Sequence, residues 1–189
     1  YSGRCRHLTP AERETLSAQR APAWRVQVPE ETVSFRDQIQ GDYAQNLAAE
    51  CGDFILRRSD GVYAYQLAVA EDDGRMGVTR VVRGWDLLSS TPRQIWLLEQ
   101  LGYSVPTYCH VPLLKSPAGR RLSKRDRDLD MGYLRAHTPP EKLVGLLAYL
   151  AGLIPRPTAL RPSDLVPEFS WSKVGQADRI VDDGIWEAL

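Results

Sequence analysis

The stretch "GVTRVVRGWDLLSSTPRQIWLLEQLG", residues 77–102, contains a predicted strand followed at once by a predicted helix. Its first eight residues are rich in β-branched side chains, which favour an extended strand. Residues 89–102 begin with Ser-Ser-Thr-Pro, repeat apolar residues at helical spacing and end at Gly102, which predicts a capped amphipathic helix. The apolar segment "TYCHVPLL", residues 107–114, then predicts another strand. This order is typical of parallel strands covered by helices.

The flanking segments extend the same α/β pattern. Thr9, Pro10 and Glu12 predict a helix that starts with a capping box and runs to about Ala21. From Pro139 onward the pattern becomes mainly helical. Upstream of residue 77 we expect three paired strands, "AWRVQV" (23–28), "TVSFRD" (32–37) and "GDFILRRSDG" (52–61). They are followed by one helix, "YAYQLAVAEDD" (63–73). The sequence therefore predicts an α/β fold with a mainly helical C-terminal part.

Composition excludes a few classes of protein. The 189 residues include 24 basic and 24 acidic side chains, so any attraction to nucleic acid must come from local clusters. Three cysteines, at positions 5, 51 and 109, are odd in number and widely spaced, which favours a reducing compartment over a disulfide framework. The sequence shows no secretory segment and no apolar run of membrane length. We therefore expect a soluble, cytoplasmic protein without membrane contact.

The segment "GRRLSKRDRDLDMG", residues 119–132, is the clearest candidate for function. A solvated surface is the usual interpretation of such a charge run. However, this run follows the last predicted strand, and open α/β sheets bind ligands beyond the carboxyl ends of their strands. There Lys124 would be a mobile positive charge for a phosphate and Ser123 a hydroxyl donor. The position favours a phosphate-binding loop.

Within that loop "RLSKR", residues 121–125, resembles the Lys-Met-Ser-Lys-Ser motif of class I aminoacyl-tRNA synthetases. The stretches "GDFILRRSDGVYAYQLAVAEDD" and "GVTRVVRGWDLLSSTPRQIWLLEQLG" are similar, in the same order, to bacterial glutamyl-tRNA synthetases and their short paralogue. The resemblance covers residue 1 to roughly residue 175 and implies the second half of a Rossmann-like catalytic domain. It implies these parts: the remainder of a zinc-binding insertion (1–22), the catalytic half-domain with an inserted acceptor-type region (23–118), the Ser-Lys loop (119–132) and a helical C-terminal region (133–189).

The resemblance also assigns roles to individual residues. Lys124, with Ser123 beside it, would contact ATP phosphates during adenylate formation, and Mg²⁺ would accompany the ATP. Tyr65 would donate a hydrogen bond to the substrate L-glutamate, and Arg83 would pair with its side-chain carboxylate. A guanidinium suits that task because it can bind a carboxylate with two hydrogen bonds. Structural alternatives are a core tyrosine at position 65 and an ordinary salt bridge at position 83.

Tyr1 and Cys5 resemble the last two ligands of the zinc module of the short paralogue. The other two ligands would form a Cys-x-Cys pair upstream of residue 1. The His-x-Gly-His motif that binds ATP would also lie upstream of residue 1. Structural zinc requires four ligands, so Tyr1 and Cys5 alone form an incomplete site. We therefore expect the chain to be the C-terminal part of a longer protein. Cys51 and Cys109 are expected to be small buried residues.

Two features favour the short paralogue over an ordinary synthetase. Only 64 residues follow Arg125, and "RGWDLL" departs from the family's acidic "GEDH"-like stretch. The resemblance then implies tRNA-independent activation of glutamate, and transfer to queuosine in the anticodon loop of tRNA(Asp), by a monomer. Alternatives are an ordinary or split glutamyl-tRNA synthetase that charges tRNA(Glu), or a non-catalytic tRNA-binding descendant. Side chains that could steer or stack on the RNA are Arg120, Arg121, Arg125, Arg127 and Trp85; Trp171 and Trp186 are expected to anchor C-terminal packing.

Overall fold

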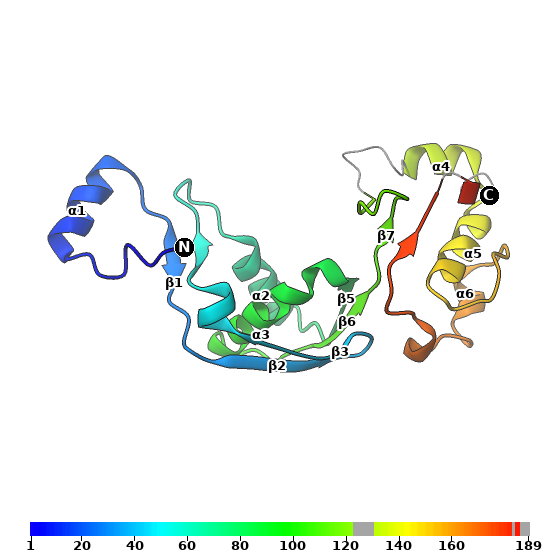
Figure 1. Cartoon of the computed structure of the whole chain (residues 1–189), viewed down its shortest axis with the longest axis horizontal. Helices are drawn as coiled ribbons and strands as arrows, with labels where there is room; N and C mark the ends of the chain where they lie inside the picture. The colour runs from blue at the N-terminus through cyan, green and yellow to red at the C-terminus, as the bar shows by residue number, and fades with distance from the viewer. Residues whose placement is uncertain (123–130, 183, 186–189) are drawn as a thin grey trace. The chain divides into compact units, whose positions relative to one another are not determined.

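The structure is a computed structural model that describes residues 1–122, 131–182 and 184–185 (Figure 1). The predictions for Ser123, Lys124, Arg125, Arg127 and Trp186 therefore lie outside the described residues. The chain divides into two compact units. The first unit comprises residues 1–37, 42–81 and 87–108, and the second comprises residues 38–41, 82–86 and 109–189.

The first unit contains mixed helices and strands, as the sequence predicts. Its elements are α1 (Pro10–Gln19), β1 (Trp24–Val26), β2 (Thr32–Asp37), β3 (Gly41–Asn46), a π-helical turn (Leu47–Cys51), β4 (Phe54–Arg57), α2 (Tyr65–Arg75) and α3 (Thr91–Gln100). In α1 the predicted capping box is confirmed: Thr9 Oγ1 accepts from the Glu12 N–H, and Glu12 Oε2 accepts from the Thr9 N–H. Helix α1 ends two residues before the predicted Ala21.

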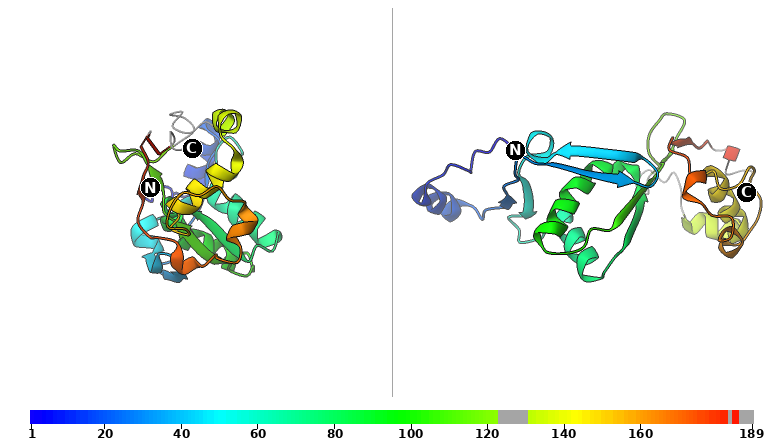
Figure 2. Two further views of the ribbon diagram at one scale, coloured as in Figure 1. Left: turned by 90° about the vertical axis from the view of Figure 1, so that its right-hand side faces the viewer. Right: turned by 90° about the horizontal axis from the view of Figure 1, so that it is seen from below.

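The strand pairing of the first unit agrees with the prediction in part. Strand β1 pairs antiparallel with β4, two of the three strands expected to be paired, whereas β2 pairs in a hairpin with β3, which was not predicted. Strand β3 was missed because "GDYAQN" lacks the alternating apolar residues of a half-buried strand. Strand β2 packs on α3 in the views of Figure 1 and Figure 2.

The predicted strand–helix–strand order is confirmed around α3. Strand β5 (Arg80–Gly84) precedes a 3-10 turn (Trp85–Ser90) and α3, and β6 (Thr107–Val111) then pairs with β5. Side-chain contacts join Arg80 to Thr107 and Arg83 to His110, a constant separation of 27 residues, as parallel strands require. The described strands pair two by two, so no wider parallel sheet forms among them.

The cap predicted for α3 is correct at one end and wrong at the other. Gly102 follows the helix with φ of 77°, a left-handed conformation that glycine adopts without strain. Ser90 instead makes no side-chain cap, because its backbone is already helical after the preceding 3-10 turn. Its hydroxyl accepts a hydrogen bond from Gln66 Nε2, at 3.1 Å.

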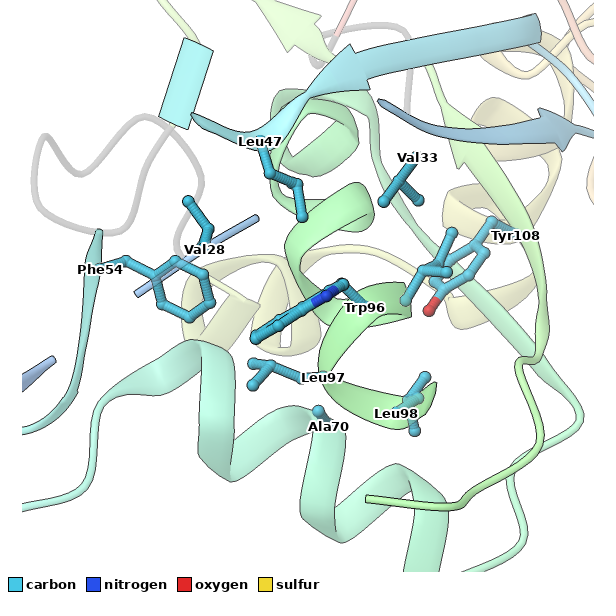
Figure 3. Packing of buried hydrophobic residues seen from close by; sticks show 10 residues of the cluster. Val28, Val33, Leu47, Phe54, Ala70, Trp96, Leu97, Leu98 and Tyr108 are labelled. Carbon is cyan, nitrogen blue, oxygen red and sulfur yellow. The ribbon is translucent and has the colours of Figure 1, made fainter. Parts of the chain in front are cut away.

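The core of the first unit is built around α3 (Figure 3). Trp96, Leu97 and Leu98 lie between side chains from the hairpin, from the π-helical turn and from α2. The ring of Trp96 meets that of Phe54 edge to face, with centroids 6.4 Å apart. The buried members are Val28, Val33, Leu47, Phe54, Ala70, Ile95, Trp96, Leu97, Leu98 and Tyr108.

After residue 131 the regular elements of the second unit are helices and one short strand, joined by long loops, so the predicted helical C-terminal part is confirmed only in part. Its elements are β7 (Leu114–Lys115), α4 (Met131–His137), α5 (Pro140–Leu150), α6 (Pro162–Leu165), a 3-10 turn (Trp171–Lys173) and β8 (Arg179–Ile180). Strand β8 was not predicted; it pairs parallel with β7. Trp171 stacks edge to face on Phe169, at 4.8 Å between centroids, in agreement with its expected packing role. Among the helices that the structure describes, none is long and apolar enough to cross a membrane.

Candidate functional site

Tyr65 is the first residue of α2, and its side chain is about half exposed. The next residue, Gln66, ties this turn to α3: its Nε2 donates to Ser90 Oγ at 3.1 Å, and its Oε1 accepts from Gln94 Nε2 at 2.8 Å. Gln94 is almost fully buried. The start of α2 is therefore held by polar contacts, and Tyr65 presents a phenol to the surface from a fixed helix turn, where it can donate a hydrogen bond.

Arg83 lies on β5 and is half-buried. Its Nε donates a hydrogen bond to Nε2 of His110 on β6, at 3.0 Å. His110 has no exposed surface, and its carbonyl oxygen accepts from Gln40 Nε2 at 2.9 Å. An imidazole nitrogen that accepts a hydrogen bond carries no proton, so His110 is neutral and protonated at Nδ1. His110 was not predicted as a site residue; the available signal was a single histidine inside an apolar strand.

Asp178 is a second residue that the sequence analysis missed. Its Oδ1 accepts hydrogen bonds from Trp85 Nε1 at 2.6 Å and from the Leu113 N–H at 2.8 Å, and its Oδ2 forms an ion pair with Lys115 Nζ at 2.7 Å. Burial acts to raise the pKa of Asp178, but the hydrogen bonds from Lys115, Leu113 and Trp85 outweigh it and lower the pKa overall. Asp178 thus links the C-terminal segment to Trp85 after β5 and to Leu113 and Lys115 after β6.

Trp85 and Arg121, two of the described candidates for RNA contact, take part in polar interactions. Trp85 donates to Asp178, and its ring centroid lies 6.0 Å from Lys115 Nζ. Arg121 forms an ion pair with Asp86. Arg120 is exposed. A contact of any of these side chains with RNA remains a prediction.

The base of the Ser-Lys loop is described up to Leu122. The Leu122 N–H donates to the Leu114 carbonyl at 3.0 Å, and the Ser116 N–H donates to the Arg120 carbonyl at 2.8 Å. Gly119, with φ of 78°, closes the turn by donating to the Ser116 carbonyl at 2.8 Å. The loop therefore begins from an ordered hairpin. The roles predicted for Ser123 and Lys124 belong to residues that follow it, outside the described part of the chain.

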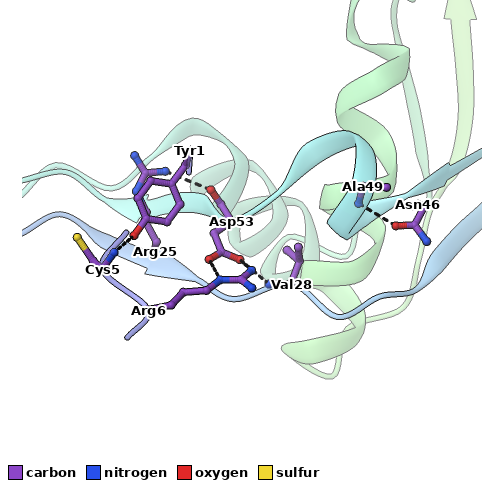
Figure 4. A network of polar contacts seen from close by, with 8 residues as sticks. All are labelled: Tyr1, Cys5, Arg6, Arg25, Val28, Asn46, Ala49 and Asp53. Atoms are coloured by element: carbon purple, nitrogen blue, oxygen red, sulfur yellow. Dashed lines mark hydrogen bonds and ion pairs between the residues drawn. The ribbon is translucent and has the colours of Figure 1, made fainter. Parts of the chain in front are cut away.

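Tyr1 and Cys5 lie close together (Figure 4), since Tyr1 Oη accepts a hydrogen bond from the Cys5 N–H at 2.7 Å. Both side chains are exposed, and the Arg25 guanidinium lies 4.3 Å from the Tyr1 ring centroid. In residues 1–122, 131–182 and 184–185, no three side chains of His, Cys, Asp or Glu gather as metal ligands. A closed zinc site needs four, so the residues described do not fit zinc. The zinc prediction is not supported.

Asp53 is the buried acidic group of this N-terminal region (Figure 4). Arg6 donates to both carboxylate oxygens, from Nε and Nη2, and the Val28 N–H donates to Oδ1 at 3.2 Å. The hydrogen bond from Arg6 is the main cause that lowers the pKa of Asp53, against the effect of burial. This paired carboxylate is a structural link between residue 6 and the start of β4, and no sequence pattern indicated it.

All three cysteines are free. Cys109 is fully buried, as predicted, while Cys51 is only half-buried. Burial raises the pKa of the Cys51 thiol, although the nearby Arg93 acts in the opposite direction. Cys109 is therefore a buried packing residue, and its raised pKa keeps the Cys51 thiol protonated at neutral pH.

The chain is similar to known proteins over most of its length. It is 47% identical over 176 residues to a glutamyl-Q tRNA(Asp) synthetase from Symbiobacterium thermophilum, covering 92% of this chain and 54% of that protein. It is 53% identical over 125 residues to the glutamyl-Q tRNA(Asp) synthetase of Neisseria gonorrhoeae, covering 66% and 41%. The chain thus spans about half the length of the curated relatives that it matches.

A solved structure shares the fold. A glutamate tRNA ligase from Elizabethkingia meningosepticum, crystallised with its amino acid, superposes with a TM-score of 0.78 at 24% identity, covering 98% of this chain and 42% of that protein. Residues 1–155 match the family described as tRNA synthetases class I (E and Q), catalytic domain. These observations confirm the predicted α/β fold and the resemblance to class I synthetases. The chain therefore belongs to the class I tRNA synthetases of the E and Q type, and carries part of their catalytic domain.

Proposed function

We propose that this chain is part of a ligase that activates L-glutamate with ATP and transfers it to queuosine in the anticodon loop of tRNA(Asp). The similarity to a glutamyl-Q tRNA(Asp) synthetase, over 92% of this chain and 54% of that protein, supports the reaction class. The structural observation that carries the proposal is Arg83, a half-buried guanidinium whose Nε is held by a buried, neutral imidazole at 3.0 Å. Such a group is suited to select a carboxylate side chain.

The preference for a carboxylate follows from the chemistry of the guanidinium. Its planar set of N–H donors matches two carboxylate oxygens, whereas a neutral amide offers one acceptor and no charge. Burial strengthens the attraction because fewer water molecules compete. Tyr65, the first residue of α2, is proposed to donate one hydrogen bond to the substrate glutamate.

Activation is proposed as an in-line displacement at phosphorus. An oxygen of the glutamate α-carboxylate attacks the α-phosphate of ATP, and pyrophosphate leaves with the electrons of the broken P–O bond. Bound Mg²⁺ would neutralise phosphate charge, although no ligand for it is assigned: Asp72 and Asp73 lie at the end of α2, where an acidic pair is usually structural. Lys124 is proposed to stabilise the charge on the departing pyrophosphate and Ser123 to donate a hydrogen bond.

Transfer is proposed as the second step. A hydroxyl of the queuosine cyclopentene ring attacks the acyl carbon of the glutamyl-adenylate, AMP leaves, and an ester forms. Arg120, Arg121, Arg125 and Arg127 are proposed to steer the anticodon loop, with Trp85 as a further contact. We also propose that the protein is a cytoplasmic monomer.

The first test is glutamate-dependent ATP–pyrophosphate exchange without tRNA. It is measured on this chain and on the longer natural protein that contains it, with Lys124→Ala and Arg83→Gln as variants. We expect exchange by the longer protein that collapses in Lys124→Ala and needs much higher glutamate in Arg83→Gln. Exchange that appears only after tRNA(Glu) is added would contradict the proposal and favour an ordinary glutamyl-tRNA synthetase.

The second test follows radiolabelled glutamate onto RNA. Purified tRNA(Asp) with queuosine, tRNA(Asp) with unmodified guanosine and tRNA(Glu) are compared as acceptors. We expect labelling of the queuosine-bearing tRNA alone. Binding of tRNA without exchange or transfer by the longer protein would identify a non-catalytic descendant instead.

A further inference from the structure

His110 is a polar side chain in a place where polar groups are costly. It lies on β6 between the buried Cys109 and Val111, and its exposed surface is zero. Burying an imidazole without partners costs free energy, so fully buried polar side chains are almost always hydrogen-bonded. The acceptor nitrogen of His110 meets this requirement through Arg83. Its backbone carbonyl is also fixed, by Gln40.

The hydrogen bond between Arg83 and His110 is donated by Nε of the guanidinium. Nε is the nitrogen at which the guanidinium joins the aliphatic stem, so a hydrogen bond at Nε fixes the rotation of the whole planar group. It occupies one of five N–H donors. The neighbouring strands β5 and β6 carry the two residues, which keeps donor and acceptor in register. The imidazole is neutral when it accepts this bond, so it orients the guanidinium without neutralising its charge.

We propose that His110 is a positioning residue, which sets the plane of the Arg83 guanidinium and thereby the affinity of the enzyme for glutamate. This inference rests on the proposed function, because it takes glutamate as the ligand of Arg83. His110 itself does not touch the substrate. Its substitution therefore weakens binding of glutamate and leaves binding of ATP unchanged.

The choice of variants follows from the position of the acceptor atom. His110→Leu introduces an apolar side chain of similar size and removes the hydrogen-bond acceptor. In His110→Gln, the Oε1 atom can reach the place of Nε2 and accept from Arg83. In His110→Asn, the shorter side chain places its oxygen near the position of Nδ1 instead. Cys109→Ala is the matched control, because Cys109 is the adjacent buried residue and points to the opposite face of β6.

The experiment measures KM for glutamate and for ATP by pyrophosphate exchange, using the longer natural protein without tRNA. A hydrogen bond from a charged donor contributes about 1.5–3 kcal/mol, so His110→Leu should raise KM for glutamate about 10–150-fold. We expect KM for ATP to stay within about twofold, and His110→Gln to recover most of the loss. Cys109→Ala should keep both KM values near those of the unchanged protein.

The outcomes separate the two proposals. If the unchanged protein shows no glutamate-dependent exchange, the proposed function fails and takes this inference with it. If the unchanged protein is active and His110→Leu is folded by circular dichroism but keeps its KM for glutamate, the inference alone is overturned. If His110→Leu does not fold, the Gln and Asn variants decide: a raised KM for glutamate in His110→Asn alone supports the inference, and equal values overturn it.

Discussion

The two compact units are stabilised in different ways. In the first unit ten buried side chains form one apolar cluster around α3. In the second unit the described part of the apolar cluster has three buried members, Leu146, Leu150 and Val181. Apolar burial is the main favourable term in folding, and it grows with the area removed from water. The second unit therefore depends more on directional contacts than the first.

Those directional contacts converge on one short segment, residues 176–179. Gln176 Nε2 donates to the Ile39 carbonyl at 2.6 Å, and Arg179 Nε donates to the Leu150 carbonyl at 3.1 Å. Between them, Asp178 accepts from Trp85, Leu113 and Lys115. Hydrogen bonds each contribute modestly, but leaving their buried partners unsatisfied is costly. In the second unit, the hydrogen bonds and the ion pair of residues 176–179 thus supply stability that in the first unit comes from apolar burial.

The largest expected effect tests the apolar side of this comparison. Trp96→Ala removes the centre of the first cluster and should lower the free energy of unfolding by about 3–5 kcal/mol. Leu146→Ala removes a smaller side chain from the second cluster and should cost about 2–4 kcal/mol. Urea denaturation of each variant, with hydrogen exchange read separately for peptides of each unit, measures both. A larger loss for Leu146→Ala would break the comparison.

A second prediction concerns two glycines in helices. A Cβ at Gly145 of α5 would lie 1.9 Å from the backbone oxygen of Thr158, whereas at Gly74 of α2 it would meet the Tyr103 ring at 2.3 Å. Alanine normally stabilises a helix by about 1 kcal/mol relative to glycine. Here we expect a net loss of about 1–3 kcal/mol for Gly145→Ala, because overpacking against backbone cannot relax easily.

The matched variant sharpens that result. Gly74→Ala should cost less than Gly145→Ala, since the Tyr103 side chain can rotate while the Thr158 backbone cannot. Thermal unfolding followed by circular dichroism compares the two variants. Stabilisation by Gly145→Ala would contradict the close approach of α5 to residue 158.

A third prediction concerns the stability of the two units at low pH. Asp53 and Asp178 both have a pKa below the usual value for aspartate, Asp53 chiefly through Arg6 and Asp178 through the hydrogen bonds that outweigh its burial. Each carboxylate therefore adds stability above the pKa of the unfolded chain, about 3.9, and this stability is lost as the pH falls through the lower pKa of the folded state. We expect both units to lose protection from hydrogen exchange below about pH 4.

Single variants assign that loss to its origin. In Asp53→Asn the acid-dependent change should shrink in peptides around residues 6, 28 and 53, and in Asp178→Asn it should shrink around residues 85, 113 and 115. Because directional contacts matter more in the second unit, Asp178→Asn should also be the more destabilising of the two at neutral pH. The reverse order would show that the apolar cluster does not protect the first unit from the loss of its ion pair.

The smallest effect is expected at the surface of the hairpin. Arg36 and Asp42 form an ion pair at 3.1 Å, with both side chains more than three-quarters exposed. Exposed pairs contribute about 0–1 kcal/mol, so Arg36→Ala should change the free energy of unfolding by less than about 1 kcal/mol. Urea denaturation at low and high salt checks this. A larger, salt-independent loss would give polar contacts more weight in the first unit than proposed.

Much of the local structure was predictable because it depends on neighbouring residues. The capping box of Thr9 and Glu12, the helix that ends before Gly102 and the strand "GVTRVVRG" follow from side chains close together in the sequence. Strand pairing was less predictable, since β3 and β8 carry too little apolar alternation to be recognised alone. They are strands because they form hydrogen bonds with their partners, β2 and β7.

The candidate site divides in the same way. Tyr65 and Arg83 became candidates from the sequence because a resemblance to a family assigns roles to single positions. His110, which lies 27 residues after Arg83, was not recognised because its importance comes from the pairing of β5 and β6. Asp178 lies 93 residues after Trp85 and was missed for the same reason.

By itself, therefore, the sequence determined the family, the main helices, and which residue types are candidates for glutamate and phosphate. The tertiary structure alone decided that His110 holds the guanidinium of Arg83 and that Asp178 ties Lys115 and Trp85 to the C-terminal segment. The physical reason is the range of the interactions. Propensity and capping act over a few residues, while burial and hydrogen bonds between distant residues exist only after the chain has folded.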